Sequence, residues 1–121
     1  MKMVLVVDDD PLIAMALKVR LASLGYESVI AHDCEQAERY IARRRPQLVL
    51  TDITMPGCSG FDLVERLGAM ECAAGIPIVY MTASMDPQLL RRINEAGAAG
   101  FLPKPYTPAE LRTVVEKALA S

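Results

Sequence analysis

The chain has 121 residues, 52% of them hydrophobic, and its formal net charge is −2 at pH 7. This length suits one domain with one core, and the slight negative charge gives no electrostatic reason to expect nucleic acid as a partner. No secretion signal is visible, and no apolar run approaches the roughly 18 residues that span a membrane. We therefore expect a single domain over residues 1–121, located in the cytoplasm, with no direct contact to nucleic acid or membrane.

Five apolar runs alternate with segments of helical spacing along the chain. The runs are Met3–Val7, Ser28–Ala31, Gln47–Thr51, Ile78–Met81 and Gly100–Leu102. Continuous stretches of Val, Ile and Leu are typical of parallel strands that are covered on both faces. The strict alternation predicts an α/β fold, a five-stranded parallel doubly wound sheet with helices on both faces.

Capping residues mark the helices between these runs. The first helix has Asp10 as its N-cap, Pro11 at its first position and Gly25 past its end. The others are expected over 35–44, 61–70, 87–96 and 108–119. For the first helix we expect a buried face made of Leu12, Met15, Ala16, Val19 and Leu24.

The three cysteines are odd in number and widely spaced. Cys34, Cys58 and Cys72 form no CxxC pair. This spacing is typical neither of a disulfide framework nor of a metal site. We interpret all three as reduced thiols, with Cys58 a partly buried small residue.

Polar residues follow four of the apolar runs. Asp8 and Asp9 follow the first run, Asp52 the third, Thr82 the fourth and Lys104 the fifth. Because the carboxyl ends of parallel strands meet at one edge of the sheet, where open α/β folds bind ligands, we expect these five side chains to converge.

Such a convergence predicts a site for a divalent cation and a phosphoryl group. Helix capping explains Asp10, but Asp8 and Asp9 lie at a strand end instead. Three carboxylates in one partly dehydrated cleft repel one another unless a cation offsets their charge, and Mg²⁺ prefers such oxygen ligands. Lys104, held between two prolines, suits a transferred phosphoryl group, whose charge spreads over its oxygens.

Several motifs carry a more specific resemblance. They are Val7-Asp8-Asp9-Asp10, Asp52-Ile53-Thr54-Met55-Pro56-Gly57, Gly60-Phe61-Asp62-Leu63, Met81-Thr82-Ala83 and Lys104-Pro105. In order and spacing the chain resembles the receiver domain of two-component response regulators over essentially its full length. The resemblance implies a flavodoxin-like (βα)5 fold with strand order 2-1-3-4-5, the order of flavodoxin and of the chemotaxis regulator of this family.

The resemblance also implies the chemistry of the site. Asp52 would be the phosphoacceptor, taking phosphoryl from a phosphohistidine on a sensor histidine kinase or a histidine phosphotransfer protein. Mg²⁺ would be bound by Asp9, Asp52 and the backbone carbonyl of Thr54, with Asp8 acting through a water. Lys104 would pair with the phosphoryl group, and its bond to Pro105 would be cis.

The same resemblance implies a switch. Thr82 would be the switch hydroxyl, with the N–H of Ala83 beside it, and Phe101 the switch aromatic, although core packing explains Phe101 equally well. Phosphorylation would change the surface of the fourth helix, fifth strand and fifth helix, which a downstream output protein or domain would bind. We expect a signalling module that dephosphorylates itself, and not a turnover enzyme.

Two departures from the family pattern lead to further expectations. Thr54 and Ser84 occupy the two positions that set phosphoryl lifetime, where chemotaxis regulators carry a carboxamide and an acid. Because both are short and uncharged, we expect them to orient attacking water less well, so that phosphoaspartate lives longer. The stretch 97–100 lacks the acidic pair of members that dimerise through this surface, so we expect a monomer when unphosphorylated.

Three other functions compete with this interpretation. A degenerate receiver would be an interaction module that is never phosphorylated, yet every chemical position is filled. An aspartate-nucleophile phosphatase would need a second acid where Thr54 stands. A flavodoxin-like cofactor carrier would need a phosphate-binding first loop, and Asp8 to Asp10 would repel phosphate. The one histidine, His32, is interpreted as a surface or edge residue.

Overall fold

The computed structural model describes residues 2–120 and contains one five-stranded parallel sheet of order β2-β1-β3-β4-β5. The strands are β1 (Met3–Val7), β2 (Glu27–Ala31), β3 (Leu48–Asp52), β4 (Ile78–Thr82) and β5 (Gly100–Pro103). Every pairing between neighbours is parallel. The expected doubly wound α/β fold is confirmed, and each strand falls on the apolar run that predicted it.

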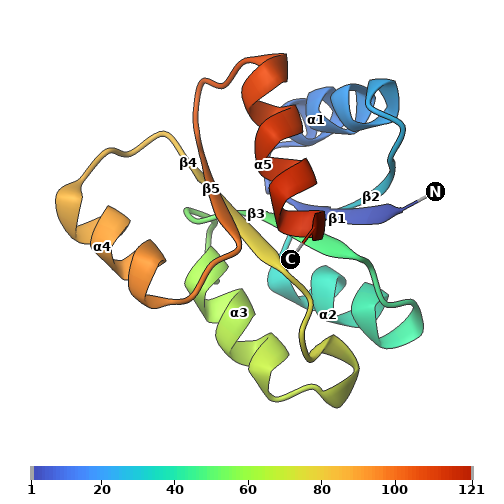
Figure 1. Cartoon of the computed structure of the whole chain (residues 1–121). Coiled ribbons are helices and arrows are strands. Elements are labelled where there is room, and N and C mark those ends of the chain that lie inside the picture. Colours follow the sequence, from blue (N-terminus) through green and yellow to red (C-terminus); the bar gives the residue numbers. More distant parts are fainter. Residues whose placement is uncertain (1, 121) are drawn as a thin grey trace.

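Helices cover both faces of this sheet (Figure 1). One layer holds α1 (Pro11–Ser23) and α5 (Pro108–Ala120), and the other holds α2 (Cys34–Arg43) and α3 (Gly60–Gly68). A fifth helix, α4 (Pro87–Glu95), lies beside β4 and β5, and a short 3₁₀ helix, η1 (Glu71–Ala73), follows α3. The sequence pattern did not predict η1.

Alternate residues of the central strands fill two separate cores. Val4 and Val6 of β1 pack with the α1 and α5 residues Leu17 and Leu111. Leu5 and Val7 belong to a second core against α2 and α3. A third, smaller cluster joins α3, β4 and α4 through Phe61, Tyr80 and Ile93. A sheet buried on both faces explains why its strands are continuous apolar runs.

Side-chain caps begin most of the helices. The Asp10 carboxylate accepts hydrogen bonds from the N–H groups of Leu12 and Ile13, as expected, and Asp86 caps α4 in the same way. Asp33 caps α2, which the sequence analysis did not identify. Each cap satisfies backbone donors that have no partner within the helix, which fixes where the helix begins.

The buried face of α1 differs from the expected one. Ala14, Leu17 and Leu21 face the core, whereas four large apolar side chains are exposed: Leu12, Ile13, Met15 and Val19. Ala16 is also exposed, and Leu24 is half-buried. The prediction failed because α1 carries apolar residues on more than one side, so that helical spacing alone does not identify the side that packs.

The cysteine prediction is wrong for two of the three residues. Cys34 and Cys58 form a disulfide, with Cα atoms 6.3 Å apart, while Cys72 is free and exposed. The two partners are 24 residues apart in sequence. They meet because β1 lies between β2 and β3, which brings the start of α2 beside the loop that follows β3.

Within residues 2–120, no helix combines the length and the apolar character needed to cross a membrane.

Candidate functional site

Three carboxylates meet at the C-terminal edge of the sheet. Asp8 and Asp9 follow β1, Asp52 ends the neighbouring strand β3, and one oxygen from each lies within 4.8 Å of the others. Asp8 is buried, Asp52 is half-buried and Asp9 is exposed. Because β1 and β3 are parallel neighbours, the residues that follow both strands lie at the same edge of the sheet. The predicted convergence of the acids is present.

Lys104 lies between two of these acids. Its Nζ is 3.2 Å from Asp52 Oδ2 and 3.4 Å from Asp8 Oδ2, and only 17% of its side chain is exposed. The backbone holds it there, because Lys104 N–H donates to the Thr82 carbonyl at 2.8 Å. The bond from Lys104 to Pro105 is cis, as expected. One ammonium therefore offsets part of the charge of two carboxylates from different strands.

Burial sets the ionisation of this pair. It raises the pKa of the Asp8 carboxyl above its ordinary 3.8, although the Asp10 N–H and the Lys104 ammonium act in the opposite direction. Burial also lowers the pKa of Lys104, but Asp52 and Asp8 outweigh it, so that this pKa lies above its ordinary 10.5. The site is partly dehydrated: Lys104 stays charged in it, and burial disfavours the ionised form of Asp8.

Thr82 ends β4, one residue after Met81, which is the register partner of Asp52 on β3, and Thr54 lies two residues after Asp52. Thr82 ends β4 with its side chain buried, and its Oγ1 accepts the N–H of Ser84 at 3.0 Å. The N–H of Thr54 donates to Asp52 Oδ1 at 3.3 Å. Ala83, Ser84 and Thr54 are all exposed, so these positions border solvent.

The loop after Asp52 is clamped at its base. Gly60 N–H donates to the Ile53 carbonyl at 2.9 Å, and Ser59 caps α3 in a reciprocal capping box with Asp62. A Cβ at Gly60 would lie 2.6 Å from the Asp52 carbonyl oxygen. Only glycine allows α3 to begin this close to the end of β3, and this approach fixes the path of the loop.

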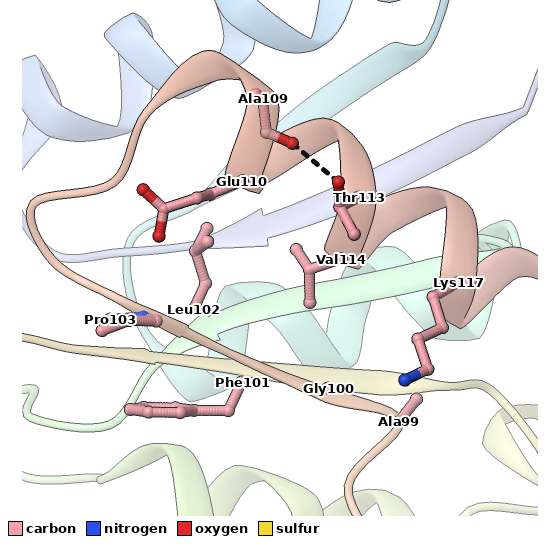
Figure 2. A pocket seen from close by; sticks show the side chains of 10 residues that line it. All are labelled: Ala99, Gly100, Phe101, Leu102, Pro103, Ala109, Glu110, Thr113, Val114 and Lys117. Carbon is pink, nitrogen blue, oxygen red and sulfur yellow. Dashed lines mark hydrogen bonds between the residues drawn. The ribbon is translucent and has the colours of Figure 1, made fainter.

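Phe101 lies on β5, away from the acids. Its ring is half-buried and packs against the cluster of Ile53, Phe61, Tyr80 and Ile93. Figure 2 shows it on the side of β5 opposite Glu110 and Val114 of α5, which line a surface hollow of about 440 Å³ with Lys117. The predicted switch residue is thus part of a packed cluster that links β5 to α4.

Two contacts near the site were missed by sequence reasoning. His32 Nδ1 lies 3.1 Å from the Asp8 carbonyl oxygen, although the residue is exposed as expected. The Arg92 guanidinium of α4 lies over the Phe61 ring of α3, 4.1 Å from its centroid. The position of His32 just after β2 could have suggested the first contact. Nothing in the spacing of Arg92 and Phe61 signals the second.

The donor set of the acidic cluster fits a hard divalent cation. All three clustered donors are carboxylate oxygens, the ligand type that Mg²⁺ takes at about 2.1 Å. Two oxygens on opposite sides of such an ion are about 4.2 Å apart, so donors within 4.8 Å need only a small inward shift.

The fold and these strand-end residues define a doubly wound α/β protein whose ligand site lies at the carboxyl edge of the sheet. The family described as "Response regulator receiver domain" matches residues 4–116. The chain therefore belongs to the response regulator receiver domains, the signalling modules of two-component systems.

Individual relatives agree with this assignment. The phosphate regulon transcriptional regulatory protein PhoB of Pseudomonas aeruginosa is 37% identical over 110 residues, which are 91% of this chain and 48% of that protein. The chain spans about half the length of this relative. Among solved structures, chemotaxis protein CheY4 of Vibrio cholerae matches with a TM-score of 0.90 and 28% identity over 98% of both chains.

A further solved structure is a receiver domain from the sensor histidine kinase PA1611 of Pseudomonas aeruginosa. It matches with a TM-score of 0.89 and 28% identity, over 99% of this chain and 98% of that one. That structure is described with a magnesium ion coordinated in its active site cleft.

Proposed function

We propose that Asp52 accepts a phosphoryl group from the phosphohistidine of a sensor histidine kinase or a histidine phosphotransfer protein, in a Mg²⁺-dependent reaction. One observation carries this proposal: the Asp52 carboxylate ends a central strand beside Asp8 and Asp9, with Lys104 Nζ 3.2 Å from its Oδ2. A carboxylate in that position has a cation partner and a cluster of metal-type ligands on the same sheet edge.

The transfer is a displacement at phosphorus. A carboxylate oxygen of Asp52 attacks, the phosphorus–nitrogen bond breaks, and the electron pair stays on the imidazole of the donor. Lys104 then pairs with an oxygen of the phosphoryl group, and the Thr82 hydroxyl donates to another. These groups are held by neighbouring strands, so positioning and charge compensation supply most of the rate.

The cation would be held by Asp9, Asp52 and the backbone carbonyl of Thr54, with Asp8 acting through a water. When bound, Mg²⁺ offsets the charge between the carboxylates and the incoming phosphoryl oxygens. The clustered oxygens of this chain and the magnesium described in the PA1611 receiver domain support the assignment.

Phosphorylation would shift the domain between two arrangements. A phosphoryl group that draws in Thr82 changes the end of β4, and Phe101 repacks within the cluster that joins β5 to α4. The surface formed by α4, β5 and α5, including the hollow in Figure 2, would then present a different shape to an output protein or domain. The transcriptional regulatory protein PhoB, about twice as long as this chain, makes an attached output domain one form of this partner.

The domain would act as a switch and not as a turnover enzyme. It would lose its phosphoryl group by its own slow hydrolysis, with Thr54 and Ser84 setting the lifetime. We place it in the cytoplasm, where kinases of this type present their phosphohistidine, as a monomer when unphosphorylated. Light scattering that shows a dimer at every protein concentration would contradict the last point.

Acetyl phosphate provides the test, because it donates phosphoryl without a cognate kinase. Wild-type protein with Mg²⁺ should gain the mass of one phosphoryl group, and chelation of Mg²⁺ should abolish the gain. The Asp52→Asn variant should gain none, while Glu71→Gln, which changes an exposed acid of η1 outside the site, should behave as wild type in labelling. Equal labelling of wild type and Asp52→Asn would overturn the proposal.

A further inference from the structure

The disulfide joins the phosphoacceptor loop to a neighbouring helix. Cys58 lies in the loop between β3 and α3, four residues after Thr54, and Cys34 is the first residue of α2. Their Cα atoms are 6.3 Å apart. The bond therefore restrains the segment 53–59, which follows Asp52 directly and carries the proposed backbone ligand of the cation.

The two sulfurs differ in access. Cys34 is 1% exposed, whereas Cys58 is half-buried and borders an open hollow of about 450 Å³ that is also lined by Gly57, Asp62, Glu65 and Arg66. Thiol–disulfide exchange depends on which sulfur an attacking thiolate can reach. Attack is therefore directed to Cys58, with Cys34 as the leaving group.

The surroundings of Cys34 suit a leaving thiolate and then a thiol. The residue begins a ten-residue helix, whose N-terminal N–H groups and dipole favour negative charge on sulfur, while burial in an apolar core acts in the opposite direction and favours the thiol. Its Sγ lies 3.7 Å from the carbonyl oxygen of Cys58 and 3.8 Å from that of Ser59. Once reduced and protonated, Cys34 can donate its S–H to these acceptors without leaving its place.

We propose that Cys34 and Cys58 form a reversible thiol–disulfide site, at which a small thiol exchanges through Cys58. A thiolate attacks Cys58 Sγ, the Cys58–Cys34 bond breaks, and Cys34 leaves with the electron pair and takes a proton from water. A second thiolate attacks the sulfur of the bound small thiol, which releases Cys58 and a low-molecular-weight disulfide. The net reaction converts one protein disulfide and two small thiols into two protein thiols and one small disulfide, and it runs in both directions.

The setting favours reversibility. Disulfides in cytosolic proteins are usually transient, because the thiol pool reduces them. The inference rests on the proposed function in two respects, the cytoplasmic location and the role of the loop after Asp52. The oxidised form holds the loop against α2, so that the Thr54 carbonyl and Asp52 are organised for the cation before it binds. Reduction removes this restraint and weakens cation binding.

The exchange is tested in a Cys72→Ser background, which removes the exposed third thiol and leaves the pair intact. Native protein is equilibrated with mixtures of glutathione and glutathione disulfide, quenched with acid and alkylated. Mass spectrometry then counts the alkylated thiols in each chain. Two thiols per chain should appear together as the ratio of glutathione to glutathione disulfide rises through the range found in cells. Protein that stays oxidised in excess glutathione, or reduced in excess glutathione disulfide, overturns the proposal.

Single-cysteine proteins test the direction of attack. With Cys72 and Cys34 both changed to Ser, the remaining Cys58 should form a mixed disulfide with glutathione disulfide. With Cys72 and Cys58 changed to Ser, the buried Cys34 should react more slowly than Cys58 by at least about tenfold. Equal rates would contradict attack at Cys58. The experiment above uses the wild-type pair, so it holds even if a variant folds poorly.

Cation affinity tests the coupling to the site. The oxidised and reduced forms of the Cys72→Ser protein are titrated with Mg²⁺ while the amide signal of Thr54 is followed by NMR. The oxidised form should bind with a dissociation constant lower by about threefold or more, as expected for a preorganised loop. Equal constants overturn the coupling. Failure of acetyl phosphate to label Asp52 in either form would instead overturn the proposed function, because neither redox measurement depends on phosphorylation.

Discussion

Lys104 Nζ lies 3.2 Å from Asp52 Oδ2, and the same nitrogen lies 3.4 Å from Asp8 Oδ2. The Lys104 ammonium thus lies between Asp8, which follows β1, and Asp52, which ends β3. A cation that binds the acids adds a positive charge near this ammonium. Removal of the ammonium should therefore lower the stability of the cation-free protein and raise its affinity for the cation.

Lys104→Met should destabilise the Mg²⁺-free protein by on the order of 1–3 kcal/mol, because two partly dehydrated carboxylates lose their counter-charge. The same change should tighten Mg²⁺ binding, since the cation then compensates the acids alone. Urea unfolding with and without Mg²⁺ measures both effects. Lys117→Met, which replaces an exposed lysine of α5, is the control and should change neither.

Asp8→Asn should stabilise the Mg²⁺-free protein at neutral pH. Since the folded-state pKa of Asp8 is raised above 3.8, the folded protein binds a proton at this carboxyl more readily than the unfolded chain does. The stability that this provides is complete below pH 3.8 and is lost as the pH rises through the raised pKa. Asparagine does not ionise, so the advantage of the variant should shrink as the pH is lowered. Denaturant unfolding with a chelator present, from neutral to acidic pH, checks this; an advantage that grows toward acid would contradict it.

Gly60→Ala should destabilise the fold by about 1–3 kcal/mol, the usual cost of forcing atoms into a packed site. The new Cβ would lie 2.6 Å from the Asp52 carbonyl oxygen, so the end of β3 or the start of α3 must move. Phosphorylation by acetyl phosphate should slow as Asp52 is displaced. Gly68→Ala, on the same helix with nothing within 4 Å of its Cβ, should instead stabilise by about 0.5–1 kcal/mol.

Arg92→Ala should loosen α4. The guanidinium lies 4.1 Å from the centroid of the Phe61 ring, a contact worth about 0.5–2 kcal/mol. Amide hydrogen exchange in α4 should accelerate, whereas exchange in β1 should keep its rate. Arg91→Ala on the same helix removes an exposed arginine and should leave α4 as it is. If both variants accelerate exchange equally, the contact with Phe61 does not hold the helix.

The wild-type phosphoaspartate should persist for minutes or longer. Thr54 and Ser84 are exposed beside the site and have neither the carboxamide nor the acid that orients attacking water in chemotaxis regulators. The double variant Thr54→Asn, Ser84→Glu should shorten the lifetime by about ten- to a hundredfold, as a positioned acid or base does. Loss of label after removal of acetyl phosphate gives the rate. A wild-type lifetime of seconds would refute the prediction.

The strands and the convergence of their carboxyl ends could be predicted from local patterns, whereas the strand order followed from the resemblance to receiver domains. Continuous apolar runs identify buried parallel strands, and parallel strands bring their carboxyl ends to one edge. Asp8, Asp9 and Asp52 therefore had to be neighbours once β1 and β3 were adjacent. The residues that end these strands carry the prediction, and no detail of helix packing enters it.

The parts that sequence reasoning missed depend on packing between distant elements. The pairing of Cys34 with Cys58 requires α2 and the β3–α3 loop to lie side by side, which spacing along the chain does not encode. The buried side of α1 was wrong because Met15 and Val19 compete with Leu17 and Leu21 as apolar candidates. In both cases the answer depends on which surface a neighbouring element offers.

Residues next to the site pack into two different hydrophobic clusters. Leu102 belongs to the core beneath α1 and α5, and Lys104 follows two residues later, just past the end of β5. Tyr80 belongs to the cluster with α3 and α4, and Thr82 continues that side of β4. Any group that touches Lys104 and Thr82 at once therefore links the ends of two strands whose preceding residues pack into different clusters. A single ligand at this edge is thus positioned to coordinate movements of both helical layers.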